Sequence, residues 1–216
     1  MRTLYHVDVS TFSRRVRLAL AHKGLEVTLR DCRADAANAA EVNRLSPLAM
    51  TPVLDDDGRI VTDSGAIVHY LDIAYPDAPR LFPADRGALA EALATMTAIE
   101  FAMTTLVDVG TRYWDLRENA AWGAVCKERI GRAQDSIDAV AKRAKRPYLA
   151  GDAWTVADMW TLTATRWVGT WAARAAEGKA TAHVIQMLTL GFRLPDELVS
   201  WAKQHDGRPD VRAIYG

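Results

Sequence analysis

The 216-residue sequence contains only two cysteines, Cys32 and Cys126, which lie far apart and form no C-x-x-C motif. This scarcity argues against a disulfide scaffold and against a structural zinc site, so no metal is expected. No stretch approaches the ~20 apolar residues that span a bilayer. The first residues, MRTLYHVDVS, are also too polar for a signal peptide. We therefore expect a cytoplasmic protein without a membrane partner.

The sequence also lacks an excess of either charge, because 27 Lys and Arg residues are balanced by 27 Asp and Glu residues. Binding to a phosphate backbone needs a basic face, so the composition argues against a nucleic-acid partner. Half of the residues are apolar and a quarter are charged, which is ordinary for a globular protein. The length allows one or two domains with a sizeable core.

The first 76 residues alternate between short strand patterns and helix patterns. Period-two alternation predicts strands, spacings of three and four predict helices, and Asp57–Gly58 is a strong hairpin turn signal. The expected elements are strands at 3–9 and 25–32, helices at 13–23 and 64–76, a hairpin at 51–63, and a short helix or irregular turn at 34–46. The predicted order is β-α-β-α-β-β-α.

The second half of the chain shows only helical patterns. Three prolines between Pro76 and Ala88 indicate a linker, placed at 77–87 between domains 1–76 and 88–216. Thr155 and Asp158 have the spacing of a capping box, which predicts a helix start there. The expected helices are 88–117, 120–145, 155–176, 181–191 and a last one near 195–209.

Three hydroxyl side chains, Ser10, Thr11 and Ser13, lie between the first strand and the first helix. A hydroxyl at a helix N-terminus can cap the helix. It can also stabilise a bound anion, because the helix dipole favours negative charge at that end. The residues alone leave both interpretations open.

Four segments, in register along the whole chain, resemble the cytosolic glutathione transferases of the serine type (theta-, zeta- or tau-like). They are STFSRRVR at 10–17, LSPLAMTPVLDDDGRIVTDSGAIVHYL at 45–71, YLAGDAWTVADM at 148–159 and SWAKQHDGRPDVRA at 200–213. The resemblance implies an α/β thioredoxin-like N-terminal domain, an all-α C-terminal domain and a homodimer. It also implies a detoxification enzyme that conjugates the thiolate of glutathione, its co-substrate, to a small hydrophobic electrophile.

The resemblance assigns roles to particular residues. Ser10 is expected to donate a hydrogen bond to the glutathione sulfur, with Thr11 and Ser13 in reserve, although Ser13 is better placed as a cap. Thr51 is expected to pair with the glutathione backbone before a cis Pro52, whereas a trans Pro52 would merely start a strand. Asp63 and Ser64 are expected to bind the γ-glutamyl end, and they can cap the following helix as well.

The sequence also departs from the family pattern. Met50 and Ala49 stand where the family often has a lysine and a glycine, which removes one cation for the glycyl carboxylate. His22, Lys23 and Arg14 are candidate replacements, and the sequence does not choose among them. Phe12 stands where zeta-like isomerases carry a cysteine, which disfavours chemistry through a protein thiol. We expect Cys32 and Cys126 to be buried apolar fillers.

The second substrate is expected in a pocket between the domains, where ligand sites concentrate. The candidate lining residues, each of which could instead be core, are Phe12, Met103, Val107, Tyr113 and Trp114. One alternative is another glutathione-dependent enzyme on the same site, namely a dehalogenase, an ether-cleaving enzyme, a peroxidase or an isomerase. The other is a scaffold protein that keeps the fold without catalysis, since fold does not fix function.

Overall fold

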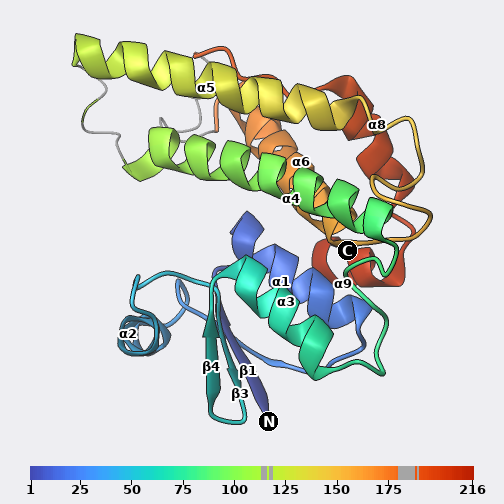
Figure 1. Cartoon of the computed structure of the whole chain (residues 1–216). Helices are drawn as coiled ribbons and strands as arrows, with labels where there is room; N and C mark the ends of the chain where they lie inside the picture. The colour runs from blue at the N-terminus through green and yellow to red at the C-terminus, as the bar shows by residue number, and fades with distance from the viewer. Residues whose placement is uncertain (113–115, 117–118, 180–187, 189) are drawn as a thin grey trace. The chain divides into compact units, whose positions relative to one another are not determined.

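A computed structural model describes residues 1–112, 116, 119–179, 188 and 190–216 (Figure 1). The chain divides into two compact units. The first comprises Met1–Pro83 together with His205–Gly216, and the second comprises Ala84–Gln204. The sequence-based division placed the last residues with the helical domain, whereas the structure packs them with the first unit.

The first unit contains a four-stranded sheet with the order β2-β1-β3-β4. The strands are β1 (Arg2–His6), β2 (Thr28–Asp31), β3 (Val53–Asp56) and β4 (Arg59–Thr62). β1 pairs with β2 in parallel and with β3 antiparallel, and β4 returns antiparallel to β3. The expected β-α-β-α-β-β-α order is confirmed, and β2 is shorter than expected because pairing with β1 begins only at Thr28.

Three helices complete this part of the chain: α1 (Thr11–His22), α2 (Ala36–Leu45) and α3 (Ser64–Ala74). α1 and α3 lie side by side, and α2 lies apart from both (Figure 1). Apolar side chains from the helices and the sheet are fully buried in this unit, among them Leu4, Val16, Leu54, Ile67 and Leu71. This core fixes the helices whose N-termini form the candidate site.

The C-terminal helix α9 (Pro209–Tyr215) packs against α1. His22 Nδ1 lies 3.0 Å from a carboxylate oxygen of Asp210, and Arg208 donates to the same carboxylate at 2.8 Å. Burial alone would raise the pKa of Asp210, but the hydrogen bonds from His22 and Arg208 outweigh it and lower the pKa to about 2. The Arg14 guanidinium lies 4.9 Å from the centre of the Tyr215 ring. These contacts explain why the last residues join the first unit.

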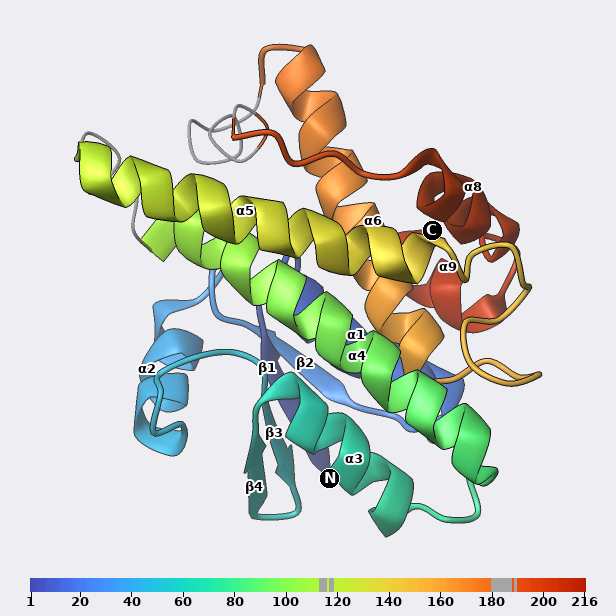
Figure 2. The ribbon, with the colours of Figure 1, turned by 45° about the horizontal axis from the view of Figure 1, so that its top comes forward.

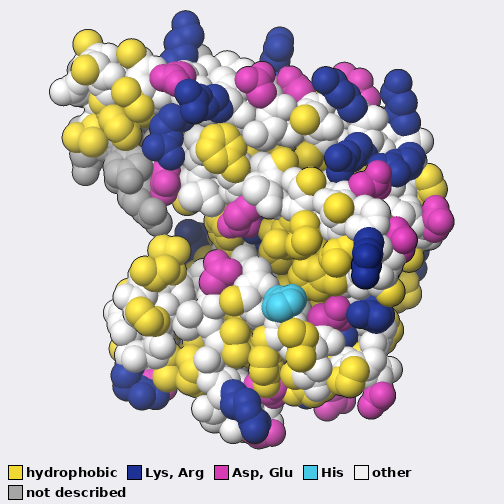
Figure 3. Space-filling model, viewed as in Figure 1, with side chains coloured by type: hydrophobic (Ala, Val, Ile, Leu, Met, Phe, Trp, Pro, Cys, Tyr) yellow, Lys and Arg dark blue, Asp and Glu magenta, His cyan; other side chains and the backbone are white. Residues whose placement is uncertain are grey.

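The second unit is built from α4 (Arg86–Val107), a π-helical turn (Asp108–Arg112), α5 (Ala120–Ala141), α6 (Val156–Ala176) and α8 (Asp196–Gln204). α4 runs beside α5 and also contacts α6, as both views of the ribbon show (Figures 1 and 2). Acidic and basic side chains are interspersed along α5 (Figure 3).

Two expected helices of the second half differ markedly from the structure. The helix expected at 88–117 ends at Val107 and is followed by the π-helical turn. The helix expected at 195–209 is two helices, because α8 ends at Gln204 and α9 starts at Pro209. Most of the helix expected at 181–191 lies outside the described residues.

One helix among the described residues, Arg86–Gly110, is long and apolar enough to cross a membrane by length and composition alone. It is therefore more apolar than the sequence analysis expected. Half of the most apolar 18-residue stretch of this helix is buried. α4 packs against α5 and α6, as the core helix of a helical bundle does.

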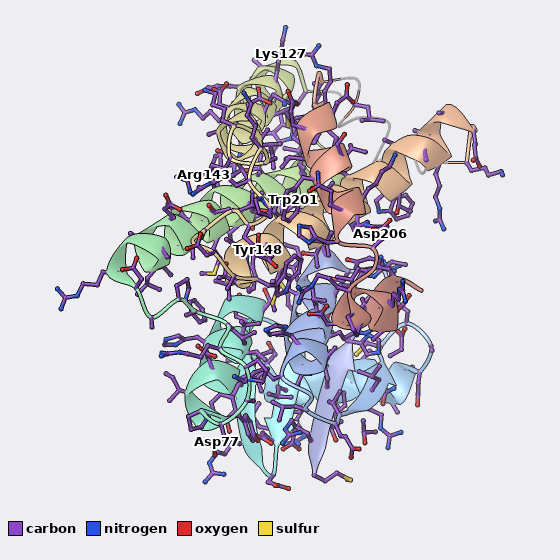
Figure 4. All side chains as sticks on the ribbon, turned by 90° about the vertical axis from the view of Figure 1, so that its right-hand side faces the viewer. Asp77, Lys127, Arg143, Tyr148, Trp201 and Asp206 are labelled. Carbon is purple, nitrogen blue, oxygen red and sulfur yellow. The ribbon has the colours of Figure 1, made fainter. Side chains whose placement is uncertain are left out.

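Polar contacts also tie the second unit together. Arg143 follows α5 and donates to the carbonyl of Glu91 at 3.1 Å and to the hydroxyl of Thr95 at 2.8 Å. Trp201, which is labelled on α8 in Figure 4, donates to the carbonyl of Pro147 at 3.2 Å. These bonds join segments about 50 residues apart in the sequence.

The capping box expected at the start of α6 is confirmed. Asp158 accepts from the backbone N–H groups of Leu149 and Thr155, both at 2.8 Å, and the Thr155 side chain accepts from Ala157. Burial raises the pKa of Asp158 to about 6, against hydrogen bonds from Leu149 and Thr155 that lower it.

Candidate functional site

Three segments that the sequence analysis singled out converge on one edge of the sheet. Tyr5, near the end of β1, pairs with Val53 at the start of β3, and Val53 also pairs with Thr62 at the end of β4. The loop to Ser10 leaves this edge from β1, Pro52 enters β3 here, and Ser64 follows β4. The antiparallel pairing of β1, β3 and β4 is what brings these segments together, since they are up to 54 residues apart.

Ser10 is the N-cap of α1. It has an extended backbone (φ −73°, ψ 125°), and its hydroxyl oxygen accepts from the backbone N–H of Ser13 at 3.4 Å. Its side chain is half-buried. The expectation that Ser13 caps the helix is therefore wrong, and Ser10 has that position instead. The helix begins at Thr11, two residues earlier than expected, and this places Ser10 at the capping position.

The other two hydroxyls of the loop are buried. The Ser13 side chain is fully buried and accepts from the backbone N–H of Val7 at 3.2 Å, which ties the end of β1 to the first turn of α1. The Thr11 side chain is also buried, and its hydroxyl has no hydrogen-bond partner within the described residues. Ser10 is thus the most accessible of the three hydroxyls.

Asp63 and Ser64 start α3 at the same edge. Asp63 is the N-cap, and one of its oxygens accepts from the N–H groups of Gly65 and Ala66 at 2.8 and 3.0 Å. Its φ of 74° lies in the left-handed region, which costs a residue other than glycine about 1–3 kcal/mol. The Ser64 hydroxyl is buried, and no partner for it occurs within the described residues. Such an orphaned hydroxyl at a helix N-terminus fits a bound anion.

The Thr51–Pro52 peptide bond is cis, as expected. Thr51 is half-buried and Pro52 is buried, directly before β3. Ala49, where the family often has glycine, has a φ of 51° and so adopts the left-handed conformation that glycine favours. Met50 is 47% exposed in the same loop.

The three cations considered for the glycyl carboxylate all have partners in the first unit. Lys23 Nζ is buried and bonds to Asp72 at 3.1 Å and to the carbonyl of Pro79 at 3.0 Å. Lys23 follows α1 and His22 is its last residue, about 18 Å along the helix axis from Ser10 at 1.5 Å per residue. His22 and Lys23 are therefore too far from Ser10, and Arg14 is the nearest of the three to the N-terminus of α1.

Sequence reasoning missed the role of Asp8, which lies in the turn between β1 and Ser10. Its carboxylate accepts from Arg17 at 2.5 Å, and its backbone carbonyl accepts from Arg14 Nε at 2.7 Å. The hydrogen bond from Arg17 lowers the pKa of Asp8. Burial and the neighbouring Arg17 lower the pKa of His6, at the end of β1. Local periodicity carries no signal for these contacts, because they join a turn to the second turn of a helix.

The candidate residues for the electrophile pocket have different surroundings. Phe12 is half-buried, with the Arg15 guanidinium 4.7 Å from its ring centre. Met103 is fully buried in α4, which favours its interpretation as core, and Val107 is half-buried at the end of that helix. Tyr113 and Trp114 lie outside the described residues.

The two cysteines differ. Cys126 is buried as expected, but Cys32 is only half-buried, because it directly follows the edge strand β2. Over the described part of the chain, no group of three or more His, Cys, Asp and Glu side chains is placed to hold a metal ion.

The arrangement at this sheet edge suits an anionic ligand. The N-termini of α1 and α3 both open there, and each carries a partial positive charge from its helix dipole. A solvent-accessible hydroxyl at one helix and an orphaned hydroxyl at the other supply donors for negative oxygens or sulfur.

Comparisons with known proteins agree with this geometry. Residues 4–79 match the family model "Glutathione S-transferase, N-terminal domain". A probable glutathione S-transferase from Oryza sativa is 38% identical over 115 residues, covering 50% of this chain and 49% of that protein. The chain thus spans about half the length of this curated relative. A probable maleylacetoacetate isomerase from Caenorhabditis elegans is 28% identical over 159 residues, covering 72% of this chain and 73% of that protein.

Solved structures share the fold across both units. A glutathione S-transferase from Methylobacterium radiotolerans, in complex with glutathione sulfonate, has a TM-score of 0.76 at 22% identity and covers 98% of this chain and 93% of that one. One from Methylobacillus flagellatus, with glutathione bound, has a TM-score of 0.75 at 19% identity, with 99% and 98% covered. Residues 4–79 thus match the N-terminal domain of glutathione S-transferases, and the chain shares the fold of these solved glutathione S-transferase structures.

Proposed function

We propose that this protein is a glutathione transferase in which the Ser10 hydroxyl stabilises the glutathione thiolate for attack on a small hydrophobic electrophile. The observation that carries the proposal is the position of Ser10: it is half-buried, caps α1, and lies at the sheet edge where two helix N-termini open. A hydrogen-bond donor and a positive local potential are what a thiolate needs to persist at neutral pH.

Capping and catalysis are compatible in Ser10. A serine hydroxyl has one hydrogen to donate and two lone pairs that accept. The contact with Ser13 uses a lone pair, because there the backbone N–H donates to the Ser10 oxygen. The hydroxyl hydrogen therefore remains available for the sulfur. Thr11 and Ser13 are the weaker candidates, since both side chains are buried.

The rest of glutathione would be held by the other two segments of the edge. The Ser64 hydroxyl and the N-terminus of α3 suit the γ-glutamyl carboxylate, with Asp63 near the amino group. Thr51 offers its backbone, next to the cis Pro52, to the cysteinyl backbone of glutathione. The strained φ of Asp63 supports a functional role for this segment, because such strain concentrates at ligand sites. The solved relatives with bound glutathione sulfonate or glutathione support this ligand class.

Steady-state conjugation of glutathione to a generic aryl halide tests the proposal, with retention on immobilised glutathione as the binding assay. We expect wild type to turn over and Ser10→Ala to lose about 10²-fold or more in kcat, the effect of removing one donor to a developing anion. Thr11→Ser is the matched control and should keep activity within about threefold. If Ser10→Ala stays within about twofold of wild type while Thr11→Ala or Ser13→Ala is inactive, the donor is misassigned. Absence of glutathione binding at millimolar concentration would favour the scaffold alternative.

A glutathione-dependent isomerase is the second candidate. The Caenorhabditis elegans relative, named as a probable maleylacetoacetate isomerase, supports it. Phe12 stands against it, since zeta-like isomerases carry a cysteine at that position. Isomerisation of a cis-configured diketo acid in the presence of glutathione, followed by ultraviolet absorbance, distinguishes the two candidates: a rate above that of aryl halide conjugation would favour the isomerase.

We further propose a cytoplasmic homodimer with a detoxification role that needs no metal. Phe12 and Val107 are half-buried whereas Met103 is fully buried, so Phe12 and Val107 are the described candidates for contact with the electrophile. Positioning and thiolate stabilisation would supply the catalysis. Analytical ultracentrifugation of the full chain tests the dimer, and a monomer at micromolar concentration would contradict it.

A further inference from the structure

The turn that presents Ser10 is held to α1 by a compact set of contacts. The turn spans residues 7–10 and is closed by the bond from Ser10 N–H to the Val7 carbonyl at 3.0 Å. Asp8 is the first residue inside the turn. The hydroxyl of Ser13 accepts from the N–H of Val7, so the entry to the turn is also fixed.

Two arginines of α1 fix Asp8 from both its side chain and its backbone. Arg17 donates to the Asp8 carboxylate at 2.5 Å, and a nitrogen of Arg14 lies 3.6 Å from its other oxygen. Arg14 also donates to the Asp8 carbonyl at 2.7 Å. The side chains of Arg14 and Arg17 are only 17% and 13% exposed, so these are not free surface charges. The Tyr215 ring, from α9, packs on the Arg14 guanidinium and so helps to hold it in place.

The Asp8 side chain is 54% exposed and its arginine partners are half-buried, so each ion pair contributes only about 0–1 kcal/mol to stability. The bond from Arg14 to the Asp8 carbonyl, together with the contacts of Arg14 and Arg17 with the carboxylate, nevertheless restricts the position of the turn. Ser10 is two residues from Asp8, and among the described residues its side chain bonds only to the Ser13 N–H, at the long distance of 3.4 Å. The position of its hydroxyl therefore depends on the turn more than on bonds of its own.

We propose that Asp8, clamped by Arg14 and Arg17, is a positioning residue that sets the Ser10 hydroxyl against the glutathione sulfur. The inference rests on the proposed function, since it requires Ser10 to act on that sulfur. A misplacement of about 1 Å at such a site can cost about 10²-fold in rate, so loosening the turn is expected to lower kcat without abolishing the fold.

An electrostatic role and a positioning role of Asp8 predict opposite changes in the pKa of the bound glutathione thiol, so the two roles can be distinguished. Replacing Asp8 by a neutral residue removes a negative charge next to Arg14, Arg17 and His6, the charged or titratable groups that act on it. That change alone makes the site more positive and lowers the pKa of the bound thiol. Loss of a well-placed Ser10 donor raises that pKa instead.

The experiment is a double-mutant cycle in the full chain, using kcat with glutathione and an aryl halide. We expect Asp8→Ala to lower kcat about tenfold in the wild-type background and less than twofold in the Ser10→Ala background, because its effect passes through Ser10. Glu128→Ala, which breaks an exposed ion pair with Arg132 on α5, is the matched control and should leave kcat unchanged.

The pH dependence of kcat, together with thiolate absorbance of bound glutathione, supplies the second readout. We expect the apparent thiol pKa of Asp8→Ala to rise by about one unit, and Asp8→Asn, which keeps an acceptor oxygen for Arg17, to recover part of the loss. Equal losses in both backgrounds, or a fall in the thiol pKa, would overturn the positioning role. If Ser10→Ala itself retains full activity, the proposed function fails instead, whatever Asp8 does.

Discussion

Asp158 carries a fully buried carboxylate that accepts hydrogen bonds from three donors. It accepts from the backbone N–H of Leu149, from the backbone N–H of Thr155 and from the Thr155 hydroxyl, at 2.8, 2.8 and 3.1 Å. It thereby joins the loop at Leu149 to the N-terminus of α6. Asp158→Ala would remove all three acceptor contacts at once.

The expected cost follows from the donors left behind. Two backbone N–H groups would remain buried, each without its acceptor, at about 1–3 kcal/mol apiece. Loss of the helix cap adds about 1 kcal/mol. We expect the free energy of unfolding to fall by about 3–4 kcal/mol, since partial access of water to the loop relieves some of the penalty.

Urea unfolding followed by far-ultraviolet circular dichroism measures this loss. Asp138→Ala is the control, because Asp138 is exposed and, among the described residues, its side chain bonds only to Gln134 on the same helix, so the loss of stability should stay below about 0.5 kcal/mol. A loss below about 1 kcal/mol for Asp158→Ala would show that the buried network does not hold α6 in place.

The difference in unfolding free energy between wild type and Asp158→Ala should also depend on pH, which tests the raised pKa of Asp158. Burial raises the pKa of Asp158 from 3.8 to about 6, so the folded state binds a proton more tightly than the unfolded chain. The stability from this group is therefore fully present below pH 3.8 and is lost as pH rises through 6. Between pH 5 and 7.5 the difference between wild type and Asp158→Ala should shrink by about 1.4 kcal/mol. A difference that grows with pH would refute the raised pKa.

Two further predictions concern the candidate site. Ser64→Ala should weaken glutathione binding about tenfold in calorimetry, as expected for a hydrogen bond to a charged group. It should leave thermal stability unchanged or slightly higher, because the buried hydroxyl has no partner in the described residues, and the reverse pattern would make Ser64 structural. Ala49→Gly should stabilise the fold by about 0.5–1 kcal/mol in urea unfolding, since it relieves a φ of 51°. Ala124→Gly, in the exposed face of α5, should destabilise by a similar amount, and equal signs for the two changes would contradict the reasoning.

Much of the secondary structure was predictable because its signals are local. Alternating apolar residues, the Asp57–Gly58 turn and the capping box of Thr155 and Asp158 each act within a few residues, and the structure contains the corresponding strands, hairpin and helix. Helical spacing in the sequence also predicts an apolar stripe on α5 at Trp122, Cys126, Ile130, Ala133, Ile137 and Val140, and all of these are buried except Trp122, which is half-buried.

The first loop shows where local reasoning fell short. Three hydroxyls within four residues offer several caps of nearly equal quality, so the pattern could not choose among Ser10, Thr11 and Ser13. The choice depended on where β1 ends and on the bond from Val7 to Ser13, which together set the first residue of α1. Two of the three candidate cations, His22 and Lys23, lie far from Ser10 for a similar reason: nearness in sequence is not nearness in space when a helix of 12 residues intervenes.

The sequence by itself determined the order of the elements, the cis Pro52 expected from the family resemblance, and the hydroxyls and acid at two helix starts. Only the tertiary structure decided that these three segments meet at one sheet edge, that Asp8 is clamped by Arg14 and Arg17, and that the last twelve residues belong with the first unit. The physical reason is the distance along the sequence over which each interaction acts. Propensities, caps and turns act over a few residues, whereas strand pairing and ion pairs join residues that share no local pattern.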